Sequence, residues 1–476
     1  MISSPEKLLP RPDRISAFPA AAVTRFFQNS RLLRWTLFLA GASFFVFLAW
    51  RQHRFVDHYA VNMMFWDQWD FYTPFFNDQD SWAIFTRQHG PHRQGAGFLV
   101  AHVVAELGRW NSRWDAFTVS FTLMAAALAG LNVAMKCGCP VWLSLPLIGL
   151  IFFNLRQYEG FVGASNLSHG AFPLLLFMLY ALSWFVRTPA LRLALLSILN
   201  FLLIFTGFGL FVGLITPVLL LVEMVHVFKA GQILRAWLAL GALALSAFSW
   251  MLFSRGYVFS PAVDGFHFPH ERPWEYFYFM GLMLANFHGI PGHHFPSIVA
   301  GLLIVTALVV LCMHHGWRIA RKGIDDQRVG VVIFCLAAYA LLYCLNTAVG
   351  RVSLGLDAAP AASRYVTLLI PAALALCIAV NHAFPRKAVA MGLAYAFLLG
   401  VGTLTLRQSD WKSVNWFHDG REAWKAAYLK THDETLANQL SSFPVYPVPG
   451  AITQRLQYLE EHHLNLFSGP PPPPPK

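Results

Sequence analysis

The amino-acid sequence predicts an all-α membrane protein with about eleven transmembrane helices. Two observations carry this prediction: the composition and the spacing of long apolar runs. Of the 476 residues, 56% are hydrophobic and 15% are aromatic, whereas only 12% are charged, and the mean hydropathy is +0.49. Soluble globular proteins carry about 25% charged residues. A single soluble core does not grow large enough to bury this much apolar surface.

A helix that crosses the hydrocarbon core needs roughly 20 mostly apolar residues, and about eleven runs approach that length. They lie near residues 33–50, 117–135, 141–154, 170–186, 191–206, 208–228, 236–254, 296–313, 329–347, 366–383 and 388–406. A further apolar stretch, 274–290, contains Glu275, Asn286 and His288 among aromatic residues. We expect it to be an interfacial or re-entrant helix. If it crosses the membrane instead, the orientation of every later span is inverted.

The distribution of charge predicts a cytoplasmic amino terminus and a carboxy terminus on the outer face. In this topology the cytoplasmic segments hold 17 of the 35 Lys and Arg residues, and the short outer loops hold 5. Basic residues favour the cytoplasmic side of short loops, whereas long segments are translocated largely regardless of charge. Orientation therefore accounts for the net charge of +11, and no nucleic-acid partner is needed to explain it.

This topology divides the chain into four parts. A basic cytoplasmic leader, 1–32, precedes a polytopic membrane domain, 33–406, whose longest outer loops are 51–116 and 255–295. A small outer module, 407–469, and a polyproline tail, 470–476, follow. The six cysteines all lie in or beside apolar runs, so the sequence predicts neither a disulfide framework nor a zinc site with spaced cysteine ligands.

The segment directly after the first span carries the first candidate site. Asp67 and Asp70 are three residues apart, so one helical face would present both, flanked by Trp66 and Trp69 at the headgroup level. A carboxylate held among aromatic side chains near lipid has a raised pKa, which suits a general base. The alternative is an aromatic belt whose carboxylates are simply solvated.

Three further groups of polar residues lie at the outer ends of predicted spans. Cations and imidazoles at these positions could bind a phosphate at the membrane surface. Each group also has a simpler explanation: contact with anionic headgroups, an ion pair between Arg156 and Glu159, or an arginine that extends along the membrane surface. Zinc binding by the histidines with Asp67 or Asp70 is conceivable, but no spacing fixes that geometry. The groups are His89, His92 and Arg93; Arg156, Gln157 and Glu159; and Arg364 with Tyr365.

Together these features resemble the GT-C class of polytopic glycosyltransferases, and more narrowly a largely uncharacterised bacterial subgroup. The similarity rests on the long first outer loop with Asp just after the first span, about eleven spans, and four short motifs. The motifs are Asp67-Gln68-Trp69-Asp70, Gly90-Pro91-His92-Arg93, Gln157-Tyr158-Glu159-Gly160 and Ser363-Arg364-Tyr365. Two positions depart from the subgroup's pattern: Gly90-Pro91 replaces a polar-acidic pair, and Gly160 replaces an Asn.

The resemblance implies a membrane enzyme that moves a sugar from a polyprenyl-phosphate donor to a cell-envelope acceptor. It implies an inverting transfer on the outer face of the cell inner membrane, with the carboxy terminus in the periplasm and with membrane lipid as a partner. Asp67 or Asp70 would act as the base. Members of the class differ in metal use, so the resemblance leaves open whether a divalent cation is needed. The candidates for binding the donor phosphate are His92, Arg93, Arg156 and Arg364, supported by Trp66, Trp69, His89, Gln157, Glu159 and Tyr365.

Two other classes of function remain as alternatives. A transporter or lipid flippase would carry charged or helix-breaking residues in its spans, and the chain has few, chiefly Glu223 and Pro217. A catalytically inactive scaffold of the cell envelope is the third hypothesis, because the two departures from the motifs affect the candidate site itself.

Overall fold

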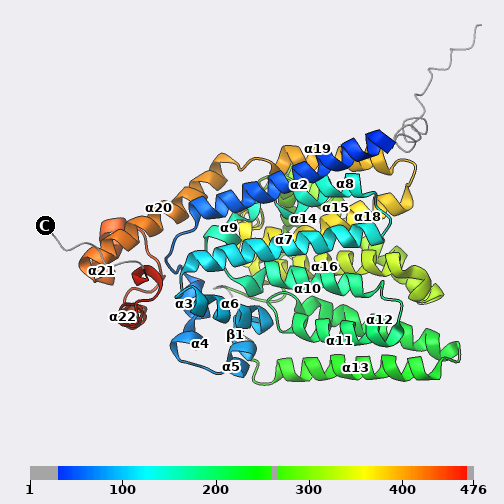
Figure 1. The fold of residues 1–476 in the computed structure, drawn as a ribbon, viewed down its shortest axis with the longest axis horizontal. Helices are drawn as coiled ribbons and strands as arrows, with labels where there is room; N and C mark the ends of the chain where they lie inside the picture. The colour runs from blue at the N-terminus through cyan, green and yellow to red at the C-terminus, as the bar shows by residue number, and fades with distance from the viewer. Residues whose placement is uncertain (1–30, 260–262, 264, 469–476) are drawn as a thin grey trace, which may run out of the picture.

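The computed structural model describes residues 31–259, 263 and 265–468. Over these ranges the chain is an elongated bundle of α-helices (Figure 1), and its only strands are a two-residue pair, β1 (Gln88–His89) and β2 (His92–Arg93). The prediction of an all-α fold is therefore confirmed. Most of the leader, residues 1–30, and the whole polyproline tail lie outside the described residues.

Seven helical segments of the described chain are long and apolar enough to cross a membrane. All seven coincide with predicted spans. Five are single helices, and the other two also include 3₁₀ segments: one joins η3 (Asp325–Gln327), α16 and η4 (Val352–Leu354), and the other joins η5 (Ser363–Leu369) to α18. The α-helices of the seven segments are α2 (Arg31–Tyr59), α7 (Ser112–Lys136), α12 (Leu210–Lys229), α13 (Ile233–Ser254), α15 (Phe295–Lys322), α16 (Arg328–Arg351) and α18 (Ile370–Ala383).

The other four predicted spans coincide with shorter helices. These are α8 (Val141–Phe152), α10 (Ala171–Ser183), α11 (Pro189–Ile204) and α19 (Ala388–Thr403). Helix α19 and the following α20 (Gln408–Thr431) together have the length and hydropathy of a span, but they are bent by 53° at the break between them. Eight spans are reached if this bent pair is counted as one. The eleven-span topology therefore stays a prediction.

The apolar stretch 274–290 forms α14 (Glu275–Phe287), and all but two of its thirteen residues are buried. It packs against α15 and α16. At Gly301 of α15 an added Cβ would lie 2.0 Å from the carbonyl oxygen of Gly281, so the two backbones approach closely where both residues are glycine. An interfacial helix leaves one face in the headgroup region. Because α14 is enclosed by its neighbours and its burial does not place it relative to a membrane, its interfacial or re-entrant position stays a prediction.

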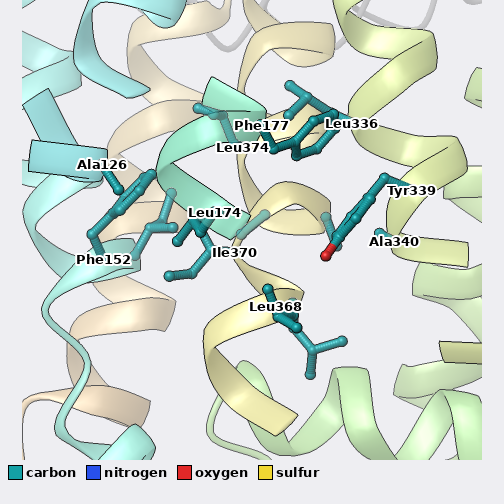
Figure 2. Packing of buried hydrophobic residues seen from close by; sticks show 14 of the residues in the cluster. Ala126, Phe152, Leu174, Phe177, Leu336, Tyr339, Ala340, Leu368, Ile370 and Leu374 are labelled. Carbon is teal, nitrogen blue, oxygen red and sulfur yellow. The ribbon is translucent and has the colours of Figure 1, made fainter. Parts of the chain in front are cut away.

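The core of the bundle consists of aromatic and aliphatic side chains that interdigitate between helices. Figure 2 shows Phe152 of α8 beside Ala126 of α7, and Phe177 of α10 near Tyr339 of α16. The rings of Phe177 and Tyr339 are stacked with their centroids 4.6 Å apart. Close apolar packing of this kind holds the helices in a fixed arrangement. The short segments that follow α2, α8 and α16 extend from one end of these packed helices.

At that end, on the left in Figure 1, short elements connect α2 to α7. They are α3 (Asp67–Phe71), α4 (Thr73–Phe76), α5 (Ser81–Thr86), the hairpin β1–β2 and α6 (Gly95–Leu107). The pair Gly90-Pro91, which departs from the subgroup's motif, forms the tip of the hairpin. His89 pairs with His92 across it, and Gly90 has a φ of +54°, where glycine is favoured. Further short elements at the same end are η1 (Leu155–Gln157), α9 (Tyr158–Val162), η2 (Leu167–His169) and α17 (Ala358–Ala361).

The residues after α19 form a small module that packs against the segment after α2. It comprises α20, α21 (Glu434–Ser441), α22 (Thr453–Glu461) and η6 (Asn465–Phe467). One apolar cluster contains side chains from both parts, among them Phe65 and Trp69 with Trp424 and Leu456. The module therefore shares a core with the segment that carries Asp67.

Candidate functional site

A cavity of about 490 Å³ opens among these short elements at the end of the bundle. Segments that are distant in the sequence line it: α3, the hairpin, α9, η2, the end of α16 and η5. Its apolar walls include Val119, Leu123 and Phe208. Its polar lining is contributed by Asp67, His89, His92, Gln157, Glu159, Asn166, His169, Tyr343, Asn346, Thr347, Arg351, Arg364, Tyr365 and Thr367.

Asp67 is the first residue of α3 and lines the cavity, next to Trp66. The backbone of Trp66 has a φ of 49°, which is uncommon for a residue other than glycine, and its side chain is 41% exposed. Trp69 is fully buried in the core shared with the carboxy-terminal module and does not line the cavity. The two tryptophans predicted as one belt therefore have different surroundings.

Asp70 points away from the cavity, toward the carboxy-terminal module. Its carboxylate accepts hydrogen bonds from the Tyr446 hydroxyl, at 3.1 and 3.2 Å, and lies 3.6 Å from Nη1 of Arg455. The negative charge of Asp70 also contributes to raising the pKa of Tyr446, after the contribution of burial. The structure thus separates the two carboxylates that the sequence places on one helical face.

Glu159 and Arg364 meet at the cavity although they lie about 200 residues apart in the sequence. Nη1 of Arg364 is 3.7 Å from Oε1 of Glu159, and the Arg364 backbone N–H donates to Oε2 of Glu159 at 3.2 Å. In return, the Glu159 N–H donates to the Ser363 hydroxyl at 3.0 Å. The Arg364 side chain is 51% exposed, so part of its hydrogen-bonding capacity faces the cavity. Tyr365, the next residue, also lines it.

Gln157 joins the loop after α8 to η5. Its amide nitrogen donates to the Phe152 carbonyl at 2.6 Å, and its amide oxygen accepts from the Thr367 hydroxyl at 2.8 Å. Both polar ends of this buried side chain are therefore occupied. Gln157 holds the loop that carries Glu159 against the segment that carries Arg364.

Three histidines form a cluster on one side of the cavity. The ring centroid of His169 is 5.1 Å from that of His92 and 6.1 Å from that of His89. Burial lowers the pKa of His92 to about 3, with smaller contributions from His89 and Arg351, and burial lowers the pKa of His169 as well. A buried imidazole without a carboxylate partner stays neutral at physiological pH. Neutral rings offer one hydrogen-bond donor and one acceptor each.

Arg93 and Arg156 do not line the cavity. The guanidinium of Arg93 donates to the backbone carbonyls of Phe253 at 2.9 Å and Arg255 at 2.6 Å, and also to that of Thr86. Arg156 donates to the Asn286 carbonyl at 2.8 Å, and burial lowers its pKa to about 10. Both side chains fasten loops to neighbouring helices.

Seven of the fourteen polar lining residues were not among the sequence-predicted site residues: Asn166, His169, Tyr343, Asn346, Thr347, Arg351 and Thr367. Asn166 is the N-cap of η2 and His169 is its last residue. The Asn166 side chain caps η2 by accepting from the Ser168 N–H at 2.8 Å, and it donates to Gln94 at 3.2 Å. Arg351 ends α16. The signal that singled out Arg364, a cation at the outer end of a span, applies equally to Arg351.

The turn between α11 and α12 closes the cavity beside the histidines. A Cβ at Gly207 would lie 2.4 Å from the Ser168 carbonyl oxygen, so the close approach of this turn to η2 requires glycine. The approach places Phe208 against His92, with ring centroids 4.4 Å apart. The apolar and polar walls of the cavity therefore meet at Phe208.

The arrangement combines two carboxylates, of which Glu159 is paired with Arg364, with two guanidinium groups and neutral imidazoles around one partly apolar space. This combination suits the binding of an anion and proton transfer beside it. Among residues 31–259, 263 and 265–468, no group of three or more His, Cys, Asp or Glu side chains is placed to hold a metal ion. No family model matches the chain, and no curated protein matches it in sequence.

Proposed function

We propose that the chain is a membrane glycosyltransferase that takes its sugar from a polyprenyl-phosphate donor. One observation carries the proposal: Asp67, Arg351 and Arg364, from three distant segments, line a single cavity whose walls include apolar side chains of the membrane domain. An acidic base, cations for a phosphate and an apolar wall for an isoprenoid chain are the groups that this reaction needs.

In the proposed reaction the acceptor hydroxyl gives its proton to the Asp67 carboxylate. The hydroxyl oxygen then forms a bond to the anomeric carbon of the donor sugar, on the face opposite the phosphate. The bond from the anomeric carbon to the phosphate oxygen breaks, and its electron pair stays on that oxygen, which inverts the anomeric configuration. Arg364 and Arg351 stabilise the negative charge that develops on the leaving phosphate.

The apolar wall supports a lipid-linked donor over a soluble one. Val119 and Leu123 belong to α7, one of the helices able to span a membrane, and both line the cavity with Phe208. An isoprenoid chain beside α7 would place its phosphate at the polar end of the helix, near the arginines. In this proposal the cavity faces the outer side of the cell inner membrane, with the amino terminus in the cytoplasm.

A transfer assay with purified protein tests the proposal. The protein in detergent is given a radiolabelled polyprenyl-phosphate sugar, and released or transferred sugar is measured for wild type, Asp67→Asn and Asp78→Asn. Asp78 is an exposed residue with a φ of 45°, a conformation that Asn also adopts readily, so Asp78→Asn is a matched control. We expect Asp67→Asn to lose about 100- to 10,000-fold in rate, as for a general base, and Asp78→Asn to retain the wild-type rate. Equal rates for the wild type and Asp67→Asn would overturn the mechanism.

A further inference from the structure

A second cavity lies away from the candidate site, between α8, α18 and α19. Its volume is about 370 Å³. Two of the few polar groups in its wall are engaged elsewhere: the Ser144 hydroxyl donates to the Pro140 carbonyl at 3.0 Å, and the Tyr395 hydroxyl is hydrogen-bonded to Nε2 of His288 at 2.6 Å. Hydrocarbon surface therefore dominates the cavity. Its aliphatic lining includes Leu143, Leu147, Ile148, Leu374, Leu376 and Leu398.

Two lysines lie next to the chain segments that line one end of this cavity. This end lies where α7 turns into α8 and α18 turns into α19, on the right in Figure 1. Lys136 is the last residue of α7 and Lys387 directly precedes α19, and both side chains are exposed. Asn381 lines this end, and its amide makes no hydrogen bond to any of the described residues.

We propose that this cavity binds an acyl chain of an anionic phospholipid whose phosphate lies beside Lys136 and Lys387. The apolar cavity, the amide of Asn381 in its wall, and two lysines that lie within two residues of the lining residues Ala134 and Ala388 match the three parts of such a lipid: hydrocarbon, ester carbonyl and phosphate. Basic pockets between transmembrane helices bind anionic headgroups. The inference does not depend on the proposed transfer reaction, because the two cavities share no lining residue.

Native mass spectrometry of the purified full chain tests the acyl-chain part of the proposal. The probes are phosphatidylglycerol and phosphatidylcholine with the same acyl chains. Ala394 is exposed and lines the cavity, so Ala394→Trp fills the space with little disturbance of the packing. Leu393→Trp adds a similar ring to an exposed neighbour that does not line the cavity. We expect Ala394→Trp to lose the bound phosphatidylglycerol and Leu393→Trp to retain it. Equal binding by these two variants would overturn the proposal.

The headgroup part is tested with lysine variants in the same experiment. Each lysine near a lipid phosphate is expected to contribute about a fivefold preference for anionic lipid. Lys136→Gln and Lys387→Gln should therefore each lower the preference for phosphatidylglycerol over phosphatidylcholine by about that factor. Lys229→Gln removes an exposed lysine from the end of α12, away from the cavity, and should leave the preference unchanged. A wild-type protein that binds both lipids equally would contradict the assignment of the headgroup.

Discussion

The backbone N–H of Trp66 donates a hydrogen bond to the carbonyl of Val445 at 2.8 Å. This bond links the residue before Asp67 to the carboxy-terminal module, almost 400 positions later in the sequence. Because Trp66 has a positive φ, its conformation is held by the surrounding structure and not by its own preference. The direction in which Asp67 faces the cavity therefore depends on the module.

Arg455 is the side chain of the module through which this dependence can be measured. Its guanidinium donates to the Trp69 carbonyl and, at 3.1 Å, to the Thr73 hydroxyl, and it lies 3.6 Å from Asp70. We expect Arg455→Ala to lower the free energy of unfolding by about 1.5–3 kcal/mol, since hydrogen bonds to charged groups contribute that much. Thermal unfolding in detergent measures the change.

The matched control for this variant is Lys430→Ala, which removes an exposed cation from α20. It should unfold within about 0.5 kcal/mol of wild type, as surface substitutions usually do. If both variants have wild-type stability, the module does not hold α3 in place.

Glu159 and Arg364 give a prediction that separates binding from stability. Because the Arg364 side chain is half exposed, its ion pair with Glu159 contributes less than about 1 kcal/mol to folding. Arg364→Ala should therefore keep a near-normal unfolding temperature but lose about 100- to 1,000-fold in transfer rate, the usual loss for one donor to a developing anion. Arg93→Lys is the comparison, because it keeps the positive charge but replaces a guanidinium that donates to backbone carbonyls. This variant should have a lower unfolding temperature and an unchanged transfer rate per folded molecule. A transfer rate unaffected by Arg364→Ala would remove this residue from the phosphate site.

Helix positions could be predicted from the sequence because apolar runs report burial or lipid contact directly. Each of the eleven predicted runs coincides with a helix, yet several helices are shorter than the runs. Helix α8 contains Pro146 and ends at Phe152, before a loop that must turn to place Arg156 and Gln157. Run length alone does not show where a chain leaves the helical path to form such a loop.

The candidate site could be predicted only in part, because long-range partners decide which charged side chains stay available. Spacing placed Asp67 and Asp70 together, but Tyr446 and Arg455 engage Asp70 from the far end of the chain. Likewise, backbone carbonyls of α13 and the residue after it engage Arg93. No local pattern marks those carbonyls as acceptors. An arginine that is free to bind a phosphate therefore cannot be distinguished in the sequence from one that is hydrogen-bonded to backbone carbonyls.

The buried histidines predict that stability falls in mild acid. The pKa of His92 in the folded chain is about 3, below the value of about 6.5 in an unfolded chain. Between these values the unfolded state binds more protons, so stability is complete above pH 6.5 and declines as the pH falls. At pH 5 the loss from His92 alone is about 2 kcal/mol, and His169 acts in the same direction.

Unfolding temperatures between pH 7.5 and pH 5 measure this effect. His92→Gln removes the titrating ring, so its unfolding temperature should vary less with pH than that of the wild type. His267→Gln changes an exposed histidine and should keep the wild-type pH dependence. Identical slopes for all three proteins would show that the cavity histidines do not titrate in this range on unfolding.

A network of ion pairs at the opposite end of the bundle accounts for the presence of Glu223 in a predicted span. Glu223 is the charged residue that most supports the transport hypothesis. Glu223 is buried, and its carboxylate accepts from Arg192 at 2.7 Å and from Arg235. Arg192 is fully buried and also pairs with Asp325 at 2.8 Å. Arg192 of α11 and Arg235 of α13 pair with Glu223 of α12. Both arginines also pair with Asp325 in the turn before α16, so the role of Glu223 is structural.

We therefore expect Glu223→Ala to lower the free energy of unfolding by about 3–5 kcal/mol, because it leaves Arg192 buried with one partner fewer. Lys229→Ala removes an exposed cation from the end of the same helix as Glu223, and it should unfold within about 0.5 kcal/mol of wild type. Thermal unfolding of the two variants side by side measures the difference. If Glu223 instead carries a transported ion or proton, Glu223→Ala should keep the unfolding temperature of the wild type and lower only the flux of substrate into proteoliposomes. A Glu223→Ala protein as stable as the wild type would therefore revive the transport hypothesis.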